Sequence, residues 1–195
     1  MSKDQKVQFV CFETILDKDA FIKRWEQYTR SVKSNKLVTL QQSEKSGAFK
    51  YISQHRFEAG ELLFVFSKEH RTSRVVQASI KTTQIGGYSV LQEERSHEAT
   101  RGEHKLFIFL TDPKVDLTIY KGVSVPCKLN IYEAYYENCR YAYILEYFVK
   151  AKDATILQTE LSLHNSDEVE IYKEFAAPKA LQGNKERDFY VWPSA

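Results

Sequence analysis

Two glutamates, Glu133 and Glu146, lie in consecutive strand-like runs of this sequence. A two-residue turn at Asn138-Cys139 would make them diagonal neighbours on one mostly apolar face, with Tyr135 beside them. Carboxylates about 7 Å apart on such a face are close enough to titrate as a coupled pair, which is how proteins build a general acid and base. We therefore predict Glu133 and Glu146 as a proton-transfer pair and Tyr135 as a ligand-contacting wall. The alternative is that each glutamate pairs with a lysine or arginine.

A histidine, His55, lies in the second strand of an earlier predicted hairpin. A turn at Ser46-Gly47 places it on the same face as Tyr51. Histidine in such a place can carry a proton or bind a ligand, although hydrogen-bonded core histidines are more common. We predict His55 as a base or ligand, with Tyr51 and Trp25 as aromatic walls of the same site. The simpler interpretation of Trp25, on the preceding predicted helix, is a core residue.

Several reaction classes lack their sequence motifs. The chain contains no GxSxG, GxxxxGK[ST], GxGxxG, CxxC or HExxH pattern. His97 and His104 lie in or beside a charged segment and are weak metal ligands. We predict no metal site, and the residues leave the cofactor open.

Composition narrows the class of protein. The 195 residues include 28 Lys and Arg and 26 Asp and Glu, a net charge of +2, which indicates neither a nucleic-acid partner nor a membrane partner. No apolar run approaches the roughly 20 residues that span a bilayer, and the polar first six residues do not resemble a signal peptide. Three cysteines, an odd number, favour reduced thiols. We expect a soluble, cytoplasmic protein.

The order of predicted elements indicates the fold class. The order strand, helix, hairpin, helix and strand occurs about twice, and a polar linker at residues 95–104 separates the two sets. The first set comprises a strand at 7–15, a helix opened by Asp17, strands at 37–44 and 49–57, an ambiguous segment at 58–74, and a strand at 75–93 with a bulge or bend at Gly86-Gly87. The second set comprises strands at 105–110, 128–137, 140–150 and 169–176, with helices within 112–120 and 154–164.

This order predicts an α+β fold of two βαββαβ ferredoxin-like repeats, packed sheet to sheet as an intramolecular α+β barrel. We place the first repeat at residues 1–97, the second at 98–177 and a tail at 178–195. The aromatic end of the tail, residues 189–192, packs on its own domain or covers a pocket or a neighbouring subunit, and we favour the first.

The element order over residues 7–176 resembles the dimeric α+β barrel superfamily, which includes monooxygenases of antibiotic biosynthesis, muconolactone isomerase-like and chlorite dismutase-like proteins. The resemblance implies a small-molecule cavity between the sheets and an oxygenase, isomerase or haem-linked role. A homodimer is a separate expectation. It carries over no catalytic residue. We therefore expect a protein that binds or transforms a small apolar or aromatic molecule, and the residues do not decide whether it is an enzyme.

Two alternatives remain. The RNA-recognition motif shares the βαββαβ order, and Leu106-Phe107-Ile108 and residues 140–144 resemble parts of its two signatures, but the glycine is missing and Glu146 stands where an aromatic residue belongs. Nucleic-acid binding is therefore the less favoured alternative. The other is a non-catalytic structural or protein-interaction module, whose aromatic faces would simply be core.

Overall fold

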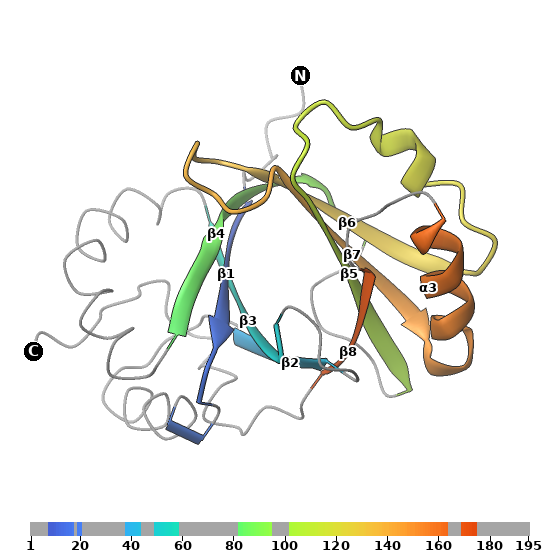
Figure 1. Cartoon of the computed structure of the whole chain (residues 1–195), viewed down its shortest axis with the longest axis horizontal. Coiled ribbons are helices and arrows are strands. Elements are labelled where there is room, and N and C mark those ends of the chain that lie inside the picture. The colour runs from blue at the N-terminus through green and yellow to red at the C-terminus, as the bar shows by residue number, and fades with distance from the viewer. Residues whose placement is uncertain are drawn as a thin grey trace, which may run out of the picture.

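The computed structural model of the chain describes residues 8–17, 19–20, 38–43, 49–58, 82–94, 102–163 and 169–174. These residues form an antiparallel, curled sheet with few helices, which fits the α+β class (Figure 1). The strands are β1 (Gln8–Ile15), β2 (Val38–Ser43), β3 (Tyr51–Glu58), β4 (Thr82–Gln92), β5 (Glu103–Leu110), β6 (Cys127–Ala134), β7 (Tyr143–Lys150) and β8 (Val169–Glu174). The helices with described bounds are η1 (Leu117–Tyr120), η2 (Ala151–Asp153) and α3 (Ala154–Ser162).

The sheet closes on itself as a barrel in the order β1-β3-β2-β8-β5-β7-β6-β4. The first four strands are arranged as β4-β1-β3-β2, and the last four repeat that arrangement as β8-β5-β7-β6. The two halves join where β2 pairs with β8 and β4 pairs with β6. Closure leaves the sheet without an open edge, so its two faces become an inside and an outside.

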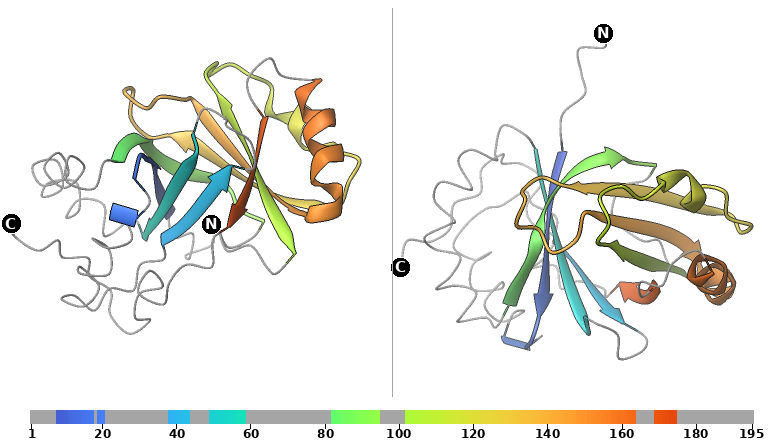
Figure 2. Two further views of the ribbon diagram at one scale, coloured as in Figure 1. Left: turned by 60° about the horizontal axis from the view of Figure 1, so that its bottom comes forward. Right: turned by 45° about the horizontal axis from the view of Figure 1, so that its top comes forward.

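Alternation along each strand sorts the side chains between these two faces. On β5, Leu106 and Ile108 belong to an outer cluster with Leu157 and Leu161 of α3, whereas Phe107 belongs to a cluster drawn from strands all around the barrel. Figures 1 and 2 show α3 on the outer side of β5 and β7. The inner cluster contains Val10, Phe12, Phe49, Ile52, Ile85, Tyr88, Phe107, Phe109, Tyr132, Ile144 and Tyr172.

A bulge in β4 falls at the predicted glycines. The register between β1 and β4 shifts between Phe12, which pairs with Gly86, and Glu13, which pairs with Gln84. A Cβ at Gly86 would lie 2.9 Å from a ring carbon of Tyr88, which is closer than real Cβ contacts come. Glycine is needed here because the Tyr88 ring packs directly against the backbone, and the predicted bulge is confirmed.

The predicted helices agree in part with those of the structure. The helix expected within 154–164 is confirmed as α3, and Asp17 accepts a hydrogen bond from the amide of Ala20 (3.0 Å), as expected of a helix start. Residues 112–120 contain only the 3-10 helix η1, capped by Asp116. The segments 21–34, 58–74 apart from Glu58, 95–101 and 178–195, on which further predictions depended, lie outside the described residues. Among those described, no helix is both long and apolar enough to cross a membrane.

The structure confirms the predicted register of the first hairpin, β2–β3, but not that of the second, β6–β7. The first prediction is confirmed, because Val38 pairs with His55 and Gln42 with Tyr51. The second is wrong by one residue, since Glu146 pairs with Asn130 rather than with Ile131.

The register prediction for the second hairpin failed because the loop at 135–142 forms backbone hydrogen bonds with β4. The amides of Tyr135 and Arg140 donate to the carbonyls of Gly87 and Ile85 on β4, both at 3.0 Å. A tight turn at Asn138-Cys139 would instead pair Tyr135 with Ala142 and Arg140 with Glu137. Because these amides bond to β4, the loop is longer and the register of the hairpin shifts by one residue.

Candidate functional site

The corrected register separates the two predicted glutamates. Glu133 pairs with Tyr143 and lies on the outer face, half-buried, where its carboxylate accepts a hydrogen bond from the Tyr143 hydroxyl at 3.4 Å. Glu146 has the opposite parity and is fully buried inside the barrel. The structure therefore does not bring Glu133 and Glu146 together as a pair.

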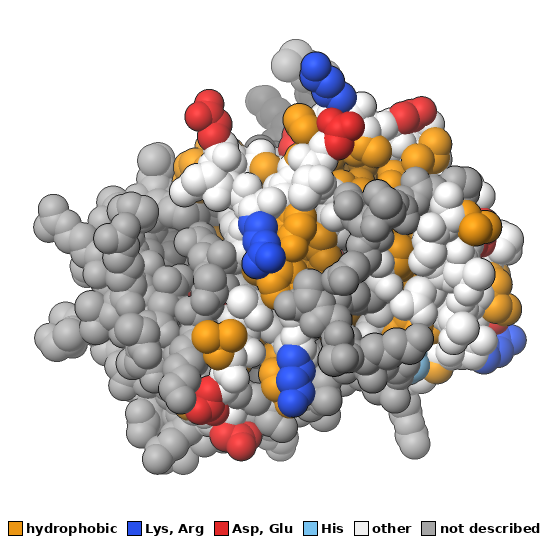
Figure 3. All heavy atoms as spheres, viewed as in Figure 1, with side chains coloured by type: hydrophobic (Ala, Val, Ile, Leu, Met, Phe, Trp, Pro, Cys, Tyr) orange, Lys and Arg blue, Asp and Glu red, His pale blue; other side chains and the backbone are white. Residues whose placement is uncertain are grey.

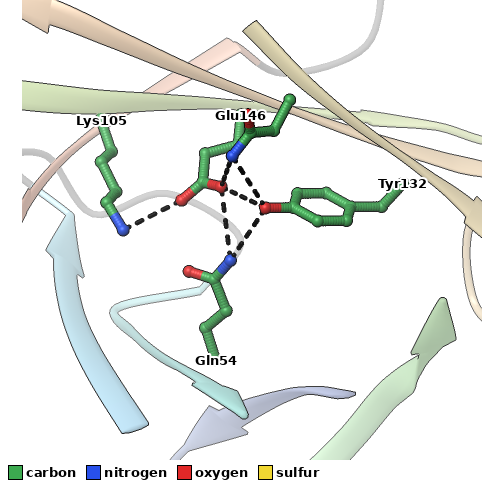
Figure 4. A network of polar contacts seen from close by, with 5 residues as sticks. Gln54, Lys105, Tyr132 and Glu146 are labelled. Carbon is green, nitrogen blue, oxygen red and sulfur yellow. Dashed lines mark hydrogen bonds and ion pairs between the residues drawn. The ribbon is translucent and has the colours of Figure 1, made fainter. Parts of the chain in front are cut away.

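Glu146 instead forms the centre of a buried polar network (Figure 4). Its Oε1 lies 2.9 Å from Nζ of Lys105. Its Oε2 accepts hydrogen bonds from the Tyr132 hydroxyl at 2.5 Å, from Asn130 Nδ2 at 3.2 Å and from Gln54 Nε2 at 3.3 Å. All five side chains have 0% exposure. We call these five residues the Glu146 network.

Strand register explains how these side chains meet. Asn130 lies directly opposite Glu146 on β6, and Tyr132 follows two residues later on the same face. Lys105 is two residues from Phe107, the β5 residue opposite Glu146, so it is a diagonal neighbour. Three of the four partners are thus placed by the local pairing of β5, β6 and β7.

The fourth partner, Gln54, comes from β3 in the other half of the chain. Its hydrogen bonds to Tyr132 and Glu146 join residues separated by 78 and 92 positions in the sequence. The network therefore connects the two halves of the barrel across its interior.

The orientation of the Asn130 amide is set from the end of β4. The backbone amide of Glu94 donates to Asn130 Oδ1 at 3.0 Å, and the Glu94 carboxylate in turn accepts from the amide of Leu129 at 3.1 Å. With its oxygen held in this way, the amide must present its nitrogen to Glu146 and Tyr132. Glu94 is thus a positioning residue for the network.

Burying the charges of Lys105 and Glu146 would cost free energy if the two groups did not face each other. Removing a carboxylate and an ammonium from water costs several kcal/mol per ion, which close pairing and hydrogen bonds must offset. The Lys105–Glu146 contact is an ion pair by distance, but its angles do not meet those of a hydrogen bond, so Oε1 has no hydrogen-bond donor in the described part of the chain. The 2.9 Å separation therefore gives a strong attraction between the two charges, while Oε1 keeps capacity to accept a hydrogen bond.

Aromatic rings surround this polar centre. Nζ of Lys105 lies 5.0 Å from the centre of the Phe148 ring, a cation–π contact. The ring of Tyr132 meets Phe12 edge-on at 5.3 Å, and Phe12 meets Phe107 in the same manner at 6.1 Å. A carboxylate that shares a short hydrogen bond with a phenol can exchange a proton with it, and the apolar walls keep competing water away.

Among the remaining predicted residues, only Tyr51 and Tyr135 have described side chains. Tyr135 is 53% exposed and meets Tyr136 edge-on at 4.9 Å, and Tyr51 is half-buried with the Lys50 ammonium 5.5 Å from its ring centre. The backbone of His55 pairs with Cys11 and Val38, but its side chain lies outside those described, as does all of Trp25.

Sequence reasoning missed Lys105, Asn130, Tyr132 and Gln54. Parity offered a signal for three of them, because Lys105 precedes an apolar run in which Phe107 and Phe109 alternate with outward residues, and Asn130 and Tyr132 alternate in the same way on β6. No pattern in the sequence around Gln54 predicts that its side chain reaches Glu146, 92 positions away.

The network does not fit a metal or a haem. Within the described part of the chain, no three His, Cys, Asp or Glu side chains gather as metal ligands. None of the five network residues is a histidine or cysteine, the side chains that most often bind haem iron.

Comparisons with known proteins inform the fold alone. No protein-family model and no curated protein matches the sequence. The structure is similar to a provisionally assigned chlorite dismutase, with a TM-score of 0.53 at 9% identity over 91% of this chain and 98% of that chain. It is also similar to a mutant chlorite dismutase from Candidatus Nitrospira defluvii, with a TM-score of 0.52 at 8% identity over 93% and 96% of the two chains. At 9% and 8% identity, these similarities show a shared fold and nothing about activity.

Proposed function

We propose that this chain binds a small, largely apolar or aromatic molecule inside its barrel, beside Glu146. One observation carries the proposal: four fully buried polar side chains from three strands converge on the buried carboxylate of Glu146 among aromatic rings. Ligand sites in proteins combine apolar walls with a few convergent polar groups in this way. If the molecule is transformed, Glu146 and Tyr132 are the pair that would move a proton, because they share the shortest hydrogen bond.

The repeated strand order supports the finer description of the fold. We propose that residues 1–97 and 98–177 are two ferredoxin-like units fused into one barrel, each with its four strands arranged alike. In this arrangement the ligand lies between the two units, since Gln54 comes from the first and the other four network residues from the second. A cytoplasmic location, a homodimer, His55 as a base and Trp25, Tyr51 and Tyr135 as walls remain predictions.

The RNA alternative receives no support from the described residues. Phe107, which would stack on a base, is fully buried inside the barrel. On the face seen in Figure 3, the lysine and arginine side chains of the described part are scattered rather than gathered in one patch. Base stacking needs an open aromatic surface with basic edges, and neither is found at these positions.

The test is native mass spectrometry of the purified chain, with an absorbance spectrum of the same sample. We expect an added small-molecule mass, or the uptake of small aromatic probes, in the wild type and in the control Glu137→Gln, which alters an exposed glutamate. The double variant Lys105→Met/Glu146→Leu replaces both charges with apolar groups and should lose that mass. Equal binding by the double variant, or no binding by the wild type, would instead favour a structural role for the network.

A further inference from the structure

We infer that the molecule bound beside Glu146 is electrically neutral and carries an O–H or N–H group that donates a hydrogen bond to Glu146 Oε1. This inference rests on the proposed function and specifies the chemical class of its ligand. It follows from the hydrogen bonds of the carboxylate, the charge of the network and the nature of its walls.

The two carboxylate oxygens of Glu146 differ in how fully they are used. Oε2 accepts from three donors, Tyr132, Asn130 and Gln54, and two of these donors also lie 3.2 Å from the Tyr132 hydroxyl. Among the described residues, Oε1 has only the Lys105 ammonium at 2.9 Å and no hydrogen-bond donor, although it is fully buried. Each carboxylate oxygen can accept two hydrogen bonds, so Oε1 retains capacity for a donor on the ligand.

Charge selects against ionic ligands. Among the described side chains that contact Glu146, Lys105 carries the single positive charge and balances the carboxylate. An anion would add an unbalanced negative charge beside Glu146, and a cation would add an unbalanced positive charge beside Lys105. Either arrangement carries a large desolvation cost that a neutral ligand avoids.

The walls favour an aromatic body. Phe107 is the β5 residue opposite Glu146, Phe148 lies against the Lys105 ammonium, and Phe12 packs between Tyr132 and Phe107. Aromatic rings prefer edge-to-face or offset contacts with other rings, which such walls provide. Phenol is therefore a suitable minimal probe, since it combines a ring with one neutral donor.

The experiment titrates the full-length chain with phenol, anisole, benzoate and benzylammonium, using ligand-observed NMR to measure the dissociation constants. Anisole has nearly the shape of phenol but no donor. We expect phenol to bind about tenfold or more tightly than anisole, because a hydrogen bond to a buried carboxylate is a strong one. Benzoate and benzylammonium should bind at least about tenfold more weakly than phenol.

The outcomes separate this inference from the proposed function. Equal affinity for phenol and anisole, or a preference for either ion, would overturn the inference while leaving binding intact. Failure of all four probes to bind would overturn the proposed function, and the inference with it. In Lys105→Met/Glu146→Leu the preference for phenol should disappear, whereas Glu137→Gln should retain it. The comparison in the wild type needs no variant, so it decides the matter even if the double variant does not fold.

Discussion

Replacing Glu146 by glutamine removes the negative charge from a network that is closed to water. Lys105 then keeps its ammonium at 0% exposure without the carboxylate that lies 2.9 Å from it. Breaking a buried ion pair by removing one partner costs about 3–5 kcal/mol. The cation–π contact with Phe148 and the acceptor oxygen that glutamine retains offset part of this, so we expect a loss of about 3 kcal/mol in the free energy of unfolding.

A double-mutant cycle distinguishes loss of the pair from loss of either side chain alone. Lys105→Met should cost about 3 kcal/mol for the same reason, since it leaves the carboxylate buried. The double variant Lys105→Met/Glu146→Gln leaves no unbalanced charge, so it should cost about 3 kcal/mol rather than the sum of about 6. The coupling free energy is then about 3 kcal/mol.

Urea unfolding followed by circular dichroism measures these free energies, and thermal unfolding gives a second reading. A loss of about 3 kcal/mol corresponds to a fall of about 6–12 °C in Tm for a chain of this size. Glu137→Gln, on the exposed loop, should stay within about 0.5 kcal/mol of the wild type. Strictly additive costs, or a Glu146→Gln variant as stable as the control, would refute the view that Lys105 and Glu146 form a dry, mutually dependent pair.

Three further predictions concern other positions. Gly86→Ala should lose about 1–3 kcal/mol in urea unfolding because its Cβ would lie 2.9 Å from the Tyr88 ring, whereas Gly122→Ala, with nothing within 4 Å, should change little; equal effects would contradict the packing described for β4. Burial, and then the charges of Glu94 and Glu160, raise the pKa of Cys127 from 9.0 to about 11. Alkylation of the folded chain by iodoacetamide, measured by mass spectrometry, should therefore be half-maximal near pH 11 at this cysteine. Because this folded pKa is raised, the stability contributed by the protonated thiol is complete below pH 9 and lost as the pH rises through about 11; half-maximal alkylation near pH 9 would contradict this. Hydrogen bonds from the Thr118 hydroxyl and amide lower the pKa of Asp116 below 3.8, so its capping of η1 should be complete above that pH and lost as the pH falls through the lowered value. An NMR titration of the Thr118 amide whose midpoint lay at or above 3.8 would contradict that direction.

Local patterns were sufficient to locate the main elements of this fold. The run at residues 105–110 is apolar and β-rich and forms most of β5, and Leu157 and Leu161 at helical spacing define the buried side of α3. The first hairpin register was predictable because a turn placed at Ser46-Gly47 in the sequence implies the pairing that β2 and β3 show. Each of these features depends on residues close together in the sequence.

The network could be predicted only in part, because its geometry depends on distant pairings. The sequence predicts Glu146 on a mostly apolar strand face, but its partners depend on a register that the loop at 135–142 shifts through hydrogen bonds to Gly87 and Ile85. The contact between Gln54 and Glu146 spans 92 positions and exists only because the barrel closes. No local periodicity carries that information.

The measurement that tests the proposed function most directly is a crystal structure of the full chain, determined with and without phenol. Binding inside the barrel predicts density for the ring among Phe107, Phe148 and Tyr132, with its oxygen within hydrogen-bond distance of Glu146 Oε1 and the Lys105–Glu146 pair retained. Phenol bound elsewhere, or an interior whose aromatic rings pack fully against the network at saturating phenol, would contradict a binding site at Glu146 and indicate that the network stabilises the barrel instead.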